Sequence, residues 1–251
     1  MVQFDLVFFA AAVPAVVFAG ISKGGFGSGA AFAATPILAL VVEPGMALGI
    51  MLPLLMVMDV TTLRPYWKRW DGEAARLLLI GGVPGVVLGA AVYRAVDADF
   101  FRLLIGAVAL GFVAFQMARA TGLLRLAPRP MGSAAGVIAG IAAGFTSFVS
   151  HAGGPPAAVY MLMKGVGKTA YQATTVIVFW AINWVKFVPF VFLGIFTADT
   201  VLACLMLAPA AVLGAWIGIH AHRWVPERAF FAITYVLLTL TGGKLVWDAL
   251  A

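Results

Sequence analysis

The sequence predicts an all-α polytopic membrane protein made of two homologous, inverted halves. Each half is expected to hold a glycine-broken helical hairpin and three transmembrane helices, about 8–10 helices in total. Three observations predict this fold: the composition, an internal repeat and the distribution of basic residues. Hydrophobic residues make up 63% of the 251 residues and charged residues 10%, against about 45–50% and about 25% in soluble domains. The charges cluster and leave apolar runs of about 20 residues, which can span a bilayer, so we expect one transmembrane domain over 1–251.

The internal repeat relates the first half of the chain to the second. Residues 20–38 and 144–162 are both glycine-rich breaks inside apolar stretches, and they align at an offset of 124 residues. The aligned identities are Gly20 with Gly144, Gly29 with Gly153, Ala33 with Ala157, and Leu38 with Leu162. The same offset pairs Asp59 with Asn183. The two halves therefore cover 1–120 and 130–251, and the prolines and charges of 125–130 favour a loop between them.

Each half begins with an apolar run that is too long for one membrane helix. The run from Phe4 to Val42 has 39 residues, which as one helix would measure about 58 Å against a bilayer core of about 30 Å. We expect it to fold back at 24–29 into a hairpin. The second run, 132–163, has its break at 153–156, where two prolines suit the first turn of a new helix.

The basic residues decide how these hairpins sit in the membrane. The spans expected after the hairpins are 45–63, 75–93 and 99–118 in the first half, and 170–193, 199–219 and 228–248 in the second. If each hairpin returns to its starting side, 11 basic residues lie on one face and Arg94, Arg102 and Lys244 on the other. If each run crosses once, the loops split about 7 to 6, which the positive-inside rule disfavours. We therefore expect inverted halves in the cell (inner) membrane, with both termini extracytoplasmic.

The composition also bears on other classes of function. The formal net charge of +6 fits positive-inside loops, so we expect a lipid bilayer as partner and no nucleic acid. The single cysteine, Cys204, provides no disulfide or metal framework. The chain has no His-Glu-x-x-His zinc motif and no Gly-x-Ser-x-Gly nucleophile elbow. We therefore expect no enzyme activity and no cofactor.

The two hairpin tips form the predicted binding site. Matching breaks in two halves of a membrane protein are typical of a transporter's binding site. Each tip carries one lone ionisable residue, Lys23 or His151. The second helix of each hairpin would begin at the tip, where its free amides favour an anion. The candidate binding residues are Lys23, Gly24, Gly25, Gly27, Ser28, Gly29, Ser150, His151, Ala152, Gly153, Gly154, Asn183 and Lys186.

Each polar candidate also has a structural interpretation. Lys23 could snorkel from a helix end to the interface, and His151 could be a core histidine that links helices. Asp59 and His151 are both candidates for proton coupling, but Asp59 could instead form a salt bridge with Arg64 or Lys23. Lys186 lies in mid-span and is a second candidate for attracting an anion.

Glycines outside the tips are expected to serve packing. Small residues repeat every four positions in Gly85/Gly89, Gly136/Gly140/Gly144 and Gly214/Gly218. Such faces let membrane helices approach closely, and they also permit a homodimer.

The second tip resembles a known signature. The run Gly-Phe-Thr-Ser-Phe-Val-Ser-His-Ala-Gly-Gly-Pro-Pro, 144–156, resembles that of the TauE/SafE sulfite exporter family, also called the four-toluene sulfonate uptake family. The first tip, 20–29, is similar to the family's first-half signature, and Asn183-Trp-Val-Lys186 also fits. The resemblance covers essentially the whole chain. It implies a secondary transporter, often an exporter, of small sulfur-containing anions such as sulfite or organosulfonates, with alternating access around the tips. A passive anion channel is the alternative, and an intramembrane enzyme has weaker support.

Overall fold

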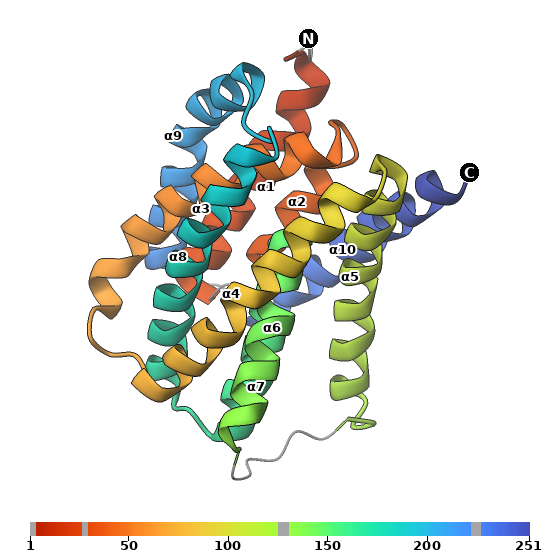
Figure 1. Ribbon diagram of the computed structural model, residues 1–251. Helices are drawn as coiled ribbons and strands as arrows, with labels where there is room; N and C mark the ends of the chain where they lie inside the picture. Colours follow the sequence, from red (N-terminus) through yellow and green to blue (C-terminus); the bar gives the residue numbers. More distant parts are fainter. Residues whose placement is uncertain (1–3, 27–29, 125–130, 222–226) are drawn as a thin grey trace.

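The computed structural model describes residues 4–26, 30–124, 131–221 and 227–251, and the regular elements within these ranges are all helices (Figure 1). In chain order they are α1 (Leu6–Ile21), the π-helix η1 (Ser22–Phe26), the 3₁₀-helix η2 (Ala31–Ala33), α2 (Ala34–Leu38), α3 (Pro44–Tyr66), α4 (Gly72–Ala95), α5 (Ala98–Ala120), α6 (Ser133–Ser150), α7 (Gly154–Lys164), α8 (Lys168–Phe192), α9 (Ala198–Ala221) and α10 (Glu227–Leu250). Eight helices in the described ranges are long and apolar enough to cross a membrane: α1, α3, α4, α5, α6, α8, α9 and α10. The predicted polytopic all-α class is confirmed.

Local sequence sets several helix ends. The carboxylate of Asp71 accepts a hydrogen bond from the Ala74 amide at 2.8 Å and caps α4. Asp97 caps α5 in the same way through the Phe100 amide, also at 2.8 Å. Side-chain oxygens at this position satisfy amides that have no partner inside the helix. The bounds of α3, α4, α5, α8, α9 and α10 correspond to the six spans that were predicted after the hairpins.

Both hairpins break near the predicted positions, but their second arms differ. In the second half, α6 ends at Ser150 and α7 begins at Gly154 and runs for 11 residues. In the first half, η1 follows α1, and the chain returns through η2 and an α2 of only 5 residues. The second arm of the first hairpin is therefore shorter than that of the second.

Close glycine contacts join the two halves. α4 packs along α6, and α9 packs along α1. A Cβ added to Gly144 would lie 2.1 Å from the Gly82 carbonyl oxygen, and one added to Gly214 would lie 2.5 Å from that of Val17. The predicted packing role of Gly144 and Gly214 is thus confirmed, because any side chain there would push two helix backbones apart.

The connecting loops gather at two ends of the molecule. The C-terminal ends of α3, α5 and α7 lie at one end, around a cavity lined by Tyr66, Arg119 and Val166. The loops after α2, α4 and α8 lie at the other end, around a cavity lined by Glu43 and Asp97. We call these the basic end and the acidic end. In Figure 1 α1 begins at the acidic end, and α6 and α7 both reach the basic end, so each hairpin returns to the end at which it started.

Candidate functional site

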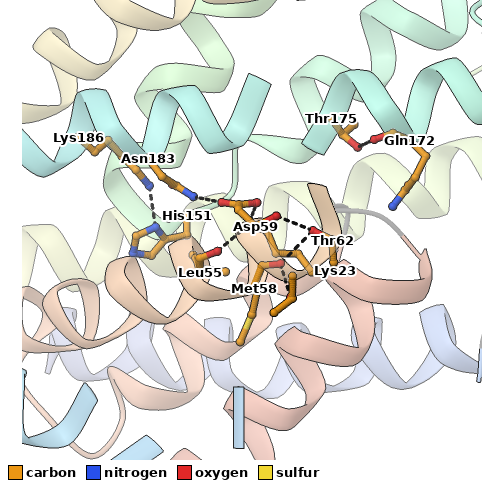
Figure 2. A network of polar contacts seen from close by, with 11 residues as sticks. Lys23, Leu55, Met58, Asp59, Thr62, His151, Gln172, Thr175, Asn183 and Lys186 are labelled. Carbon is orange, nitrogen blue, oxygen red and sulfur yellow. Dashed lines mark hydrogen bonds and ion pairs between the residues drawn. The ribbon is translucent and has the colours of Figure 1, made fainter. Parts of the chain in front are cut away.

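Five polar side chains meet in the middle of the helix bundle and form what we call the central cluster (Figure 2). They come from η1, α3, the residue that ends α6, and α8. Their members are Lys23, Asp59, His151, Asn183 and Lys186, and none is more than 8% exposed. Ionisable groups at such depth are costly and usually functional. Five residues that the sequence singles out are thus brought together.

The first part of the cluster is an ion pair between Lys23 and Asp59. The Lys23 ammonium also donates a hydrogen bond to the Leu55 carbonyl oxygen at 3.2 Å. The second carboxylate oxygen of Asp59 accepts a hydrogen bond from the Asn183 side-chain amide at 2.7 Å. Lys23 therefore does not snorkel to an interface, and of the two salt bridges considered for Asp59, the one to Lys23 forms.

The second part of the cluster joins Lys186 to His151. The Lys186 ammonium nitrogen lies 2.7 Å from His151 Nδ1 and 3.0 Å from the Ser147 carbonyl oxygen. His151 Nε2 lies 3.3 Å from the Leu48 carbonyl oxygen. An ammonium only donates, and a carbonyl only accepts. This hydrogen-bond pattern assigns the ring proton to Nε2 and makes Nδ1 the acceptor.

The backbone at His151 is unusual. Its φ of 57° lies in the left-handed region, which residues other than glycine rarely adopt. The conformation ends α6 and lets the His151 and Ala152 amides bond back to the carbonyls of Ser147 and Thr146. It leaves the imidazole buried beside α8. A strained residue held by its surroundings is typical of a functional position.

The two halves meet in this cluster through equivalent positions. Asp59 and Asn183, which are hydrogen bonded to each other, are 124 residues apart, the offset of the repeat. At the same offset Lys23 corresponds to Ser147, and Lys186 corresponds to Thr62. The cluster therefore contains two lysines and one carboxylate, because the half that supplies Lys186 supplies no acid.

A small cavity lies against the cluster. Its volume is about 20 Å³, and Lys23, Ser147, His151, Gly154 and Asn183 are among the residues that line it. A cavity needs about 10–15 Å³ to hold one water molecule. The space therefore suits a water molecule and is too small for a sulfur oxyanion. In this conformation the centre of the molecule is closed.

The remaining predicted residues have various surroundings. A Cβ on Gly24 would lie 2.4 Å from the Ala215 carbonyl oxygen, so Gly24 faces α9. Gly25 lines the cavity at the basic end. Gly153 packs against the Phe179 ring, 2.4 Å from where its Cβ would be. Gly27, Ser28 and Gly29 lie outside the described residues.

Two other predicted residues take part in local hydrogen bonds at the end of α6. Ser150 is fully buried and its hydroxyl donates to the Thr146 carbonyl oxygen at 3.4 Å. The carbonyl oxygen of Ala152 accepts from the Thr146 hydroxyl at 2.9 Å. These contacts hold the break between α6 and α7 in shape.

Sequence reasoning missed the backbone partners of the cluster. The carbonyl oxygens of Leu48 and Leu55 accept from His151 and Lys23. Nothing in an apolar helix sequence marks which carbonyl a buried cation will reach. In the described ranges, no three His, Cys, Asp or Glu side chains lie close enough together to hold a metal ion.

One comparison with known proteins identifies the family of the chain. The chain matches the sequence model of the family described as "Sulfite exporter TauE/SafE" over residues 12–245. No curated protein and no solved structure gives a significant match. Because the match covers nearly the whole chain and includes the central cluster, the chain belongs to the TauE/SafE family.

Proposed function

From this family membership and the central cluster, we propose that the protein is a secondary transporter that exports a small sulfur-containing anion, such as sulfite or an organosulfonate. The observation that carries the proposal is the charge of the central cluster. Two buried lysines, Lys23 and Lys186, face one carboxylate, Asp59. A buried charge needs a compensating partner. An oxyanion would supply the second negative charge, and its oxygens would accept hydrogen bonds from the lysines.

Asp59 occupies the place that the anion needs. Its carboxylate pairs with Lys23 beside the closed cavity, so an incoming oxyanion competes with it for the ammonium. Removing one partner from a buried ion pair costs about 3–5 kcal/mol. A proton on Asp59 removes that cost, because the neutral acid no longer needs Lys23 and can keep its hydrogen bond with Asn183. In this mechanism the anion and a proton enter the site together.

The second half supplies the other binding group. When the anion lies beside Lys186, its charge stabilises the ammonium form. His151 Nδ1 accepts a hydrogen bond from that ammonium. His151 is also the other candidate for carrying a coupled proton. Asp59 and His151 would then provide two protonation sites on opposite sides of one anion.

Alternating access would follow from the internal repeat. In our proposal the two hairpins belong to inverted halves that rock about the crossing of α3 with α8. The basic end faces the cytoplasm by the positive-inside rule, which leaves both termini extracytoplasmic. Cysteines introduced at Ala98 and Ala120, at the two ends of α5, should then label from opposite faces of intact cells.

Flux measurements in proteoliposomes test the function. When a proton gradient is imposed across the vesicle membrane, radiolabelled sulfite should move against its own concentration gradient. Flux that only follows the sulfite gradient would identify a passive channel instead. Consumption of sulfite by the purified protein would identify an enzyme. A thermal-shift screen with sulfite, sulfoacetate, isethionate, taurine, thiosulfate and sulfate would define the ligand, because a ligand specific to the folded state raises its melting temperature.

A further inference from the structure

A chain of aromatic rings runs from the acidic end to the central cluster. Tyr93 on α4 and Phe101 on α5 line the cavity of about 350 Å³ at that end, and their ring centres lie 4.9 Å apart in edge contact. The Tyr93 ring also contacts Phe148 of α6, with 6.3 Å between the centres. Phe148 in turn contacts Phe190 of α8 at 5.0 Å. We call these four residues the aromatic wall.

Phe190 is the innermost ring of the aromatic wall. Its centre lies 6.3 Å from that of the His151 imidazole, and it follows Lys186 by one turn of α8. Phe190 and Phe148 are fully buried, and they line neither the acidic-end cavity nor the central cavity of about 20 Å³. A Cβ on Gly89 would lie 2.5 Å from the Phe148 Cβ, so this glycine lets the wall pack directly against α4. Packed rings therefore stand between the acidic-end cavity and the central cluster.

The central cluster is covered less deeply on the side of the basic end. The cavity of about 710 Å³ at that end is lined by Gly25 from the first hairpin and Pro155 from the second. Lys23 and Gly154 line the central cavity, and they are only two residues and one residue away from these positions in the chain. In this conformation the site is thus closer to the basic-end cavity than to the acidic-end cavity.

Phe190 has an aromatic equivalent in the first half of the chain. The offset of 124 residues pairs Phe190 with Tyr66. The residue before each ring is a proline inside a long helix, Pro189 in α8 and Pro65 in α3. Because α8 ends at the acidic end and α3 ends at the basic end, the two rings flank the central cluster from opposite sides. Phe190 is fully buried in the aromatic wall, whereas Tyr66 is half-buried and lines the basic-end cavity.

We propose that Phe190 and Tyr66 are the two gate residues of the transporter, and that this conformation has the Phe190 gate closed and the Tyr66 gate open. The inference rests on the proposed transport function and names the residues that control access to its site. When the two halves rock, Phe190 leaves the aromatic wall and Tyr66 covers the first hairpin near Gly25. The proline before each ring has no amide to bond to the preceding turn, so the helix bends there at little cost.

A buried reporter cysteine measures the Phe190 gate without requiring transport. In a Cys204→Ser background, which removes the single native cysteine, Ser147→Cys places a thiol on the central cavity. The membrane-impermeant reagent 2-sulfonatoethyl methanethiosulfonate is added to one face at a time, in right-side-out and inside-out vesicles. A separate Ala98→Cys variant identifies the acidic-end face, because position 98 is exposed there. Phe190→Ala should raise the labelling rate of the reporter from that face about tenfold or more.

Phe192→Ala is the matched control for this measurement. It removes the same kind of ring two positions further along α8, but Phe192 is 85% exposed and lies outside the aromatic wall, so the labelling rate should not change. Phe190→Leu keeps an apolar side chain and carries the test if the alanine variant does not fold, and it should raise labelling from the same face by a smaller factor. Equal rates in the variants of Phe190 and Phe192, or a rise confined to the opposite face, would overturn the proposal.

Tyr66→Ala tests the opposite gate. Because the Tyr66 ring already lines the basic-end cavity, its loss should leave labelling of the reporter from the acidic-end face unchanged. Sulfite should nevertheless leak down its gradient whenever the Phe190 gate opens, so uphill flux should be lost. Tyr66→Phe keeps the ring and should retain uphill flux. Uphill transport at the wild-type rate in Tyr66→Ala would show that Tyr66 is not a gate.

The two measurements keep the gates separate from the transport function. If the wild-type protein moves no sulfite, the proposed function fails, while the labelling rates still report whether Phe190 closes the central cavity. If sulfite is transported but Phe190→Ala keeps full uphill flux and an unchanged labelling rate, the proposed function stands and the gate inference fails.

Discussion

The two hairpins occupy equivalent places in the repeat but contribute different chemistry. The first carries its cation, Lys23, on the tip and pairs it with Asp59 from the following long helix. The second carries a base, His151, on the tip and takes its cation, Lys186, from the following long helix. The first arrangement pairs a lysine with an acid, and the second pairs a lysine with an imidazole and has no acid. In our proposal, the two copies of the repeat keep equivalent positions but divide binding and charge compensation between them.

The largest difference is expected when each lysine is removed in turn. Lys23→Met leaves the Asp59 carboxylate buried without its cation, which should cost about 3–5 kcal/mol of stability and abolish flux. Adding Asp59→Asn should restore the melting temperature, because the amide needs no counter-charge, yet it should not restore flux. Thermal unfolding in detergent and sulfite flux measure the two effects. An unchanged melting temperature in Lys23→Met would mean that the ion pair does not stabilise the fold.

Lys186→Met should behave in the opposite way. No acid depends on Lys186 alone, so its loss should leave the melting temperature unchanged or slightly higher. The anion loses a charged hydrogen bond of about 1.5–3 kcal/mol, so affinity should fall about tenfold or more. Titration of sulfite against the purified protein measures the affinity. If Lys186→Met and Lys23→Met destabilise the protein equally, the proposed division between the two halves is wrong.

Those features of the central cluster that depend on position along the chain could be predicted from the sequence. The offset of the repeat paired Asp59 with Asn183, and the two are in contact. Lys23 and His151 were singled out because each lies in a glycine-rich break inside a long apolar run, and both belong to the central cluster. Charge and periodicity predict these features because they depend on position along the chain.

Other features depend on the rotation and tilt of helices, which sequence spacing does not fix. The contact of Lys186 with His151 requires a particular face of α8 to meet the end of α6. The carbonyl oxygens of Leu48 and Leu55 become partners only once that packing exists. The short length of α2 was not predicted either.

His151 offers a smaller and more specific test of the second hairpin. Gln can accept from Lys186 and donate to the Leu48 carbonyl, so His151→Gln should fold while losing the titratable ring. The pH dependence of flux that arises from this ring should disappear. His151→Asn is the control for backbone strain, because asparagine adopts the left-handed conformation more readily. A pH profile identical to that of the wild type in both variants would leave Asp59 as the sole coupling candidate.

The smallest effect concerns how the second arm of each hairpin is anchored. Lys164, at the end of α7, pairs with Asp71 at 2.9 Å and with Glu73 at 2.9 Å, whereas the equivalent position in the first half is Leu40. Burial alone would raise the pKa of Asp71, but hydrogen bonds from the Ala74 amide and Lys164 outweigh it and lower that pKa. Burial likewise opposes the charge of Lys164, yet Glu73 and Asp71 raise the pKa of its ammonium.

The signs of these shifts give a pH window. The lowered pKa of Asp71 means that its contribution is present above the unfolded value near 3.8 and is lost as the pH falls through the folded value. The raised pKa of Lys164 means that its contribution is present below about 10.5 and is lost as the pH rises through the folded value. Asp71→Asn should therefore lower stability by less than about 1 kcal/mol at neutral pH, because the pair is partly exposed and screened. The difference from wild type in thermal unfolding should vanish at acidic pH. Because Asp71→Asn changes only the ion pair that anchors the end of α7, sulfite affinity should stay unchanged. A large fall in affinity would show that this ion pair shapes the central site.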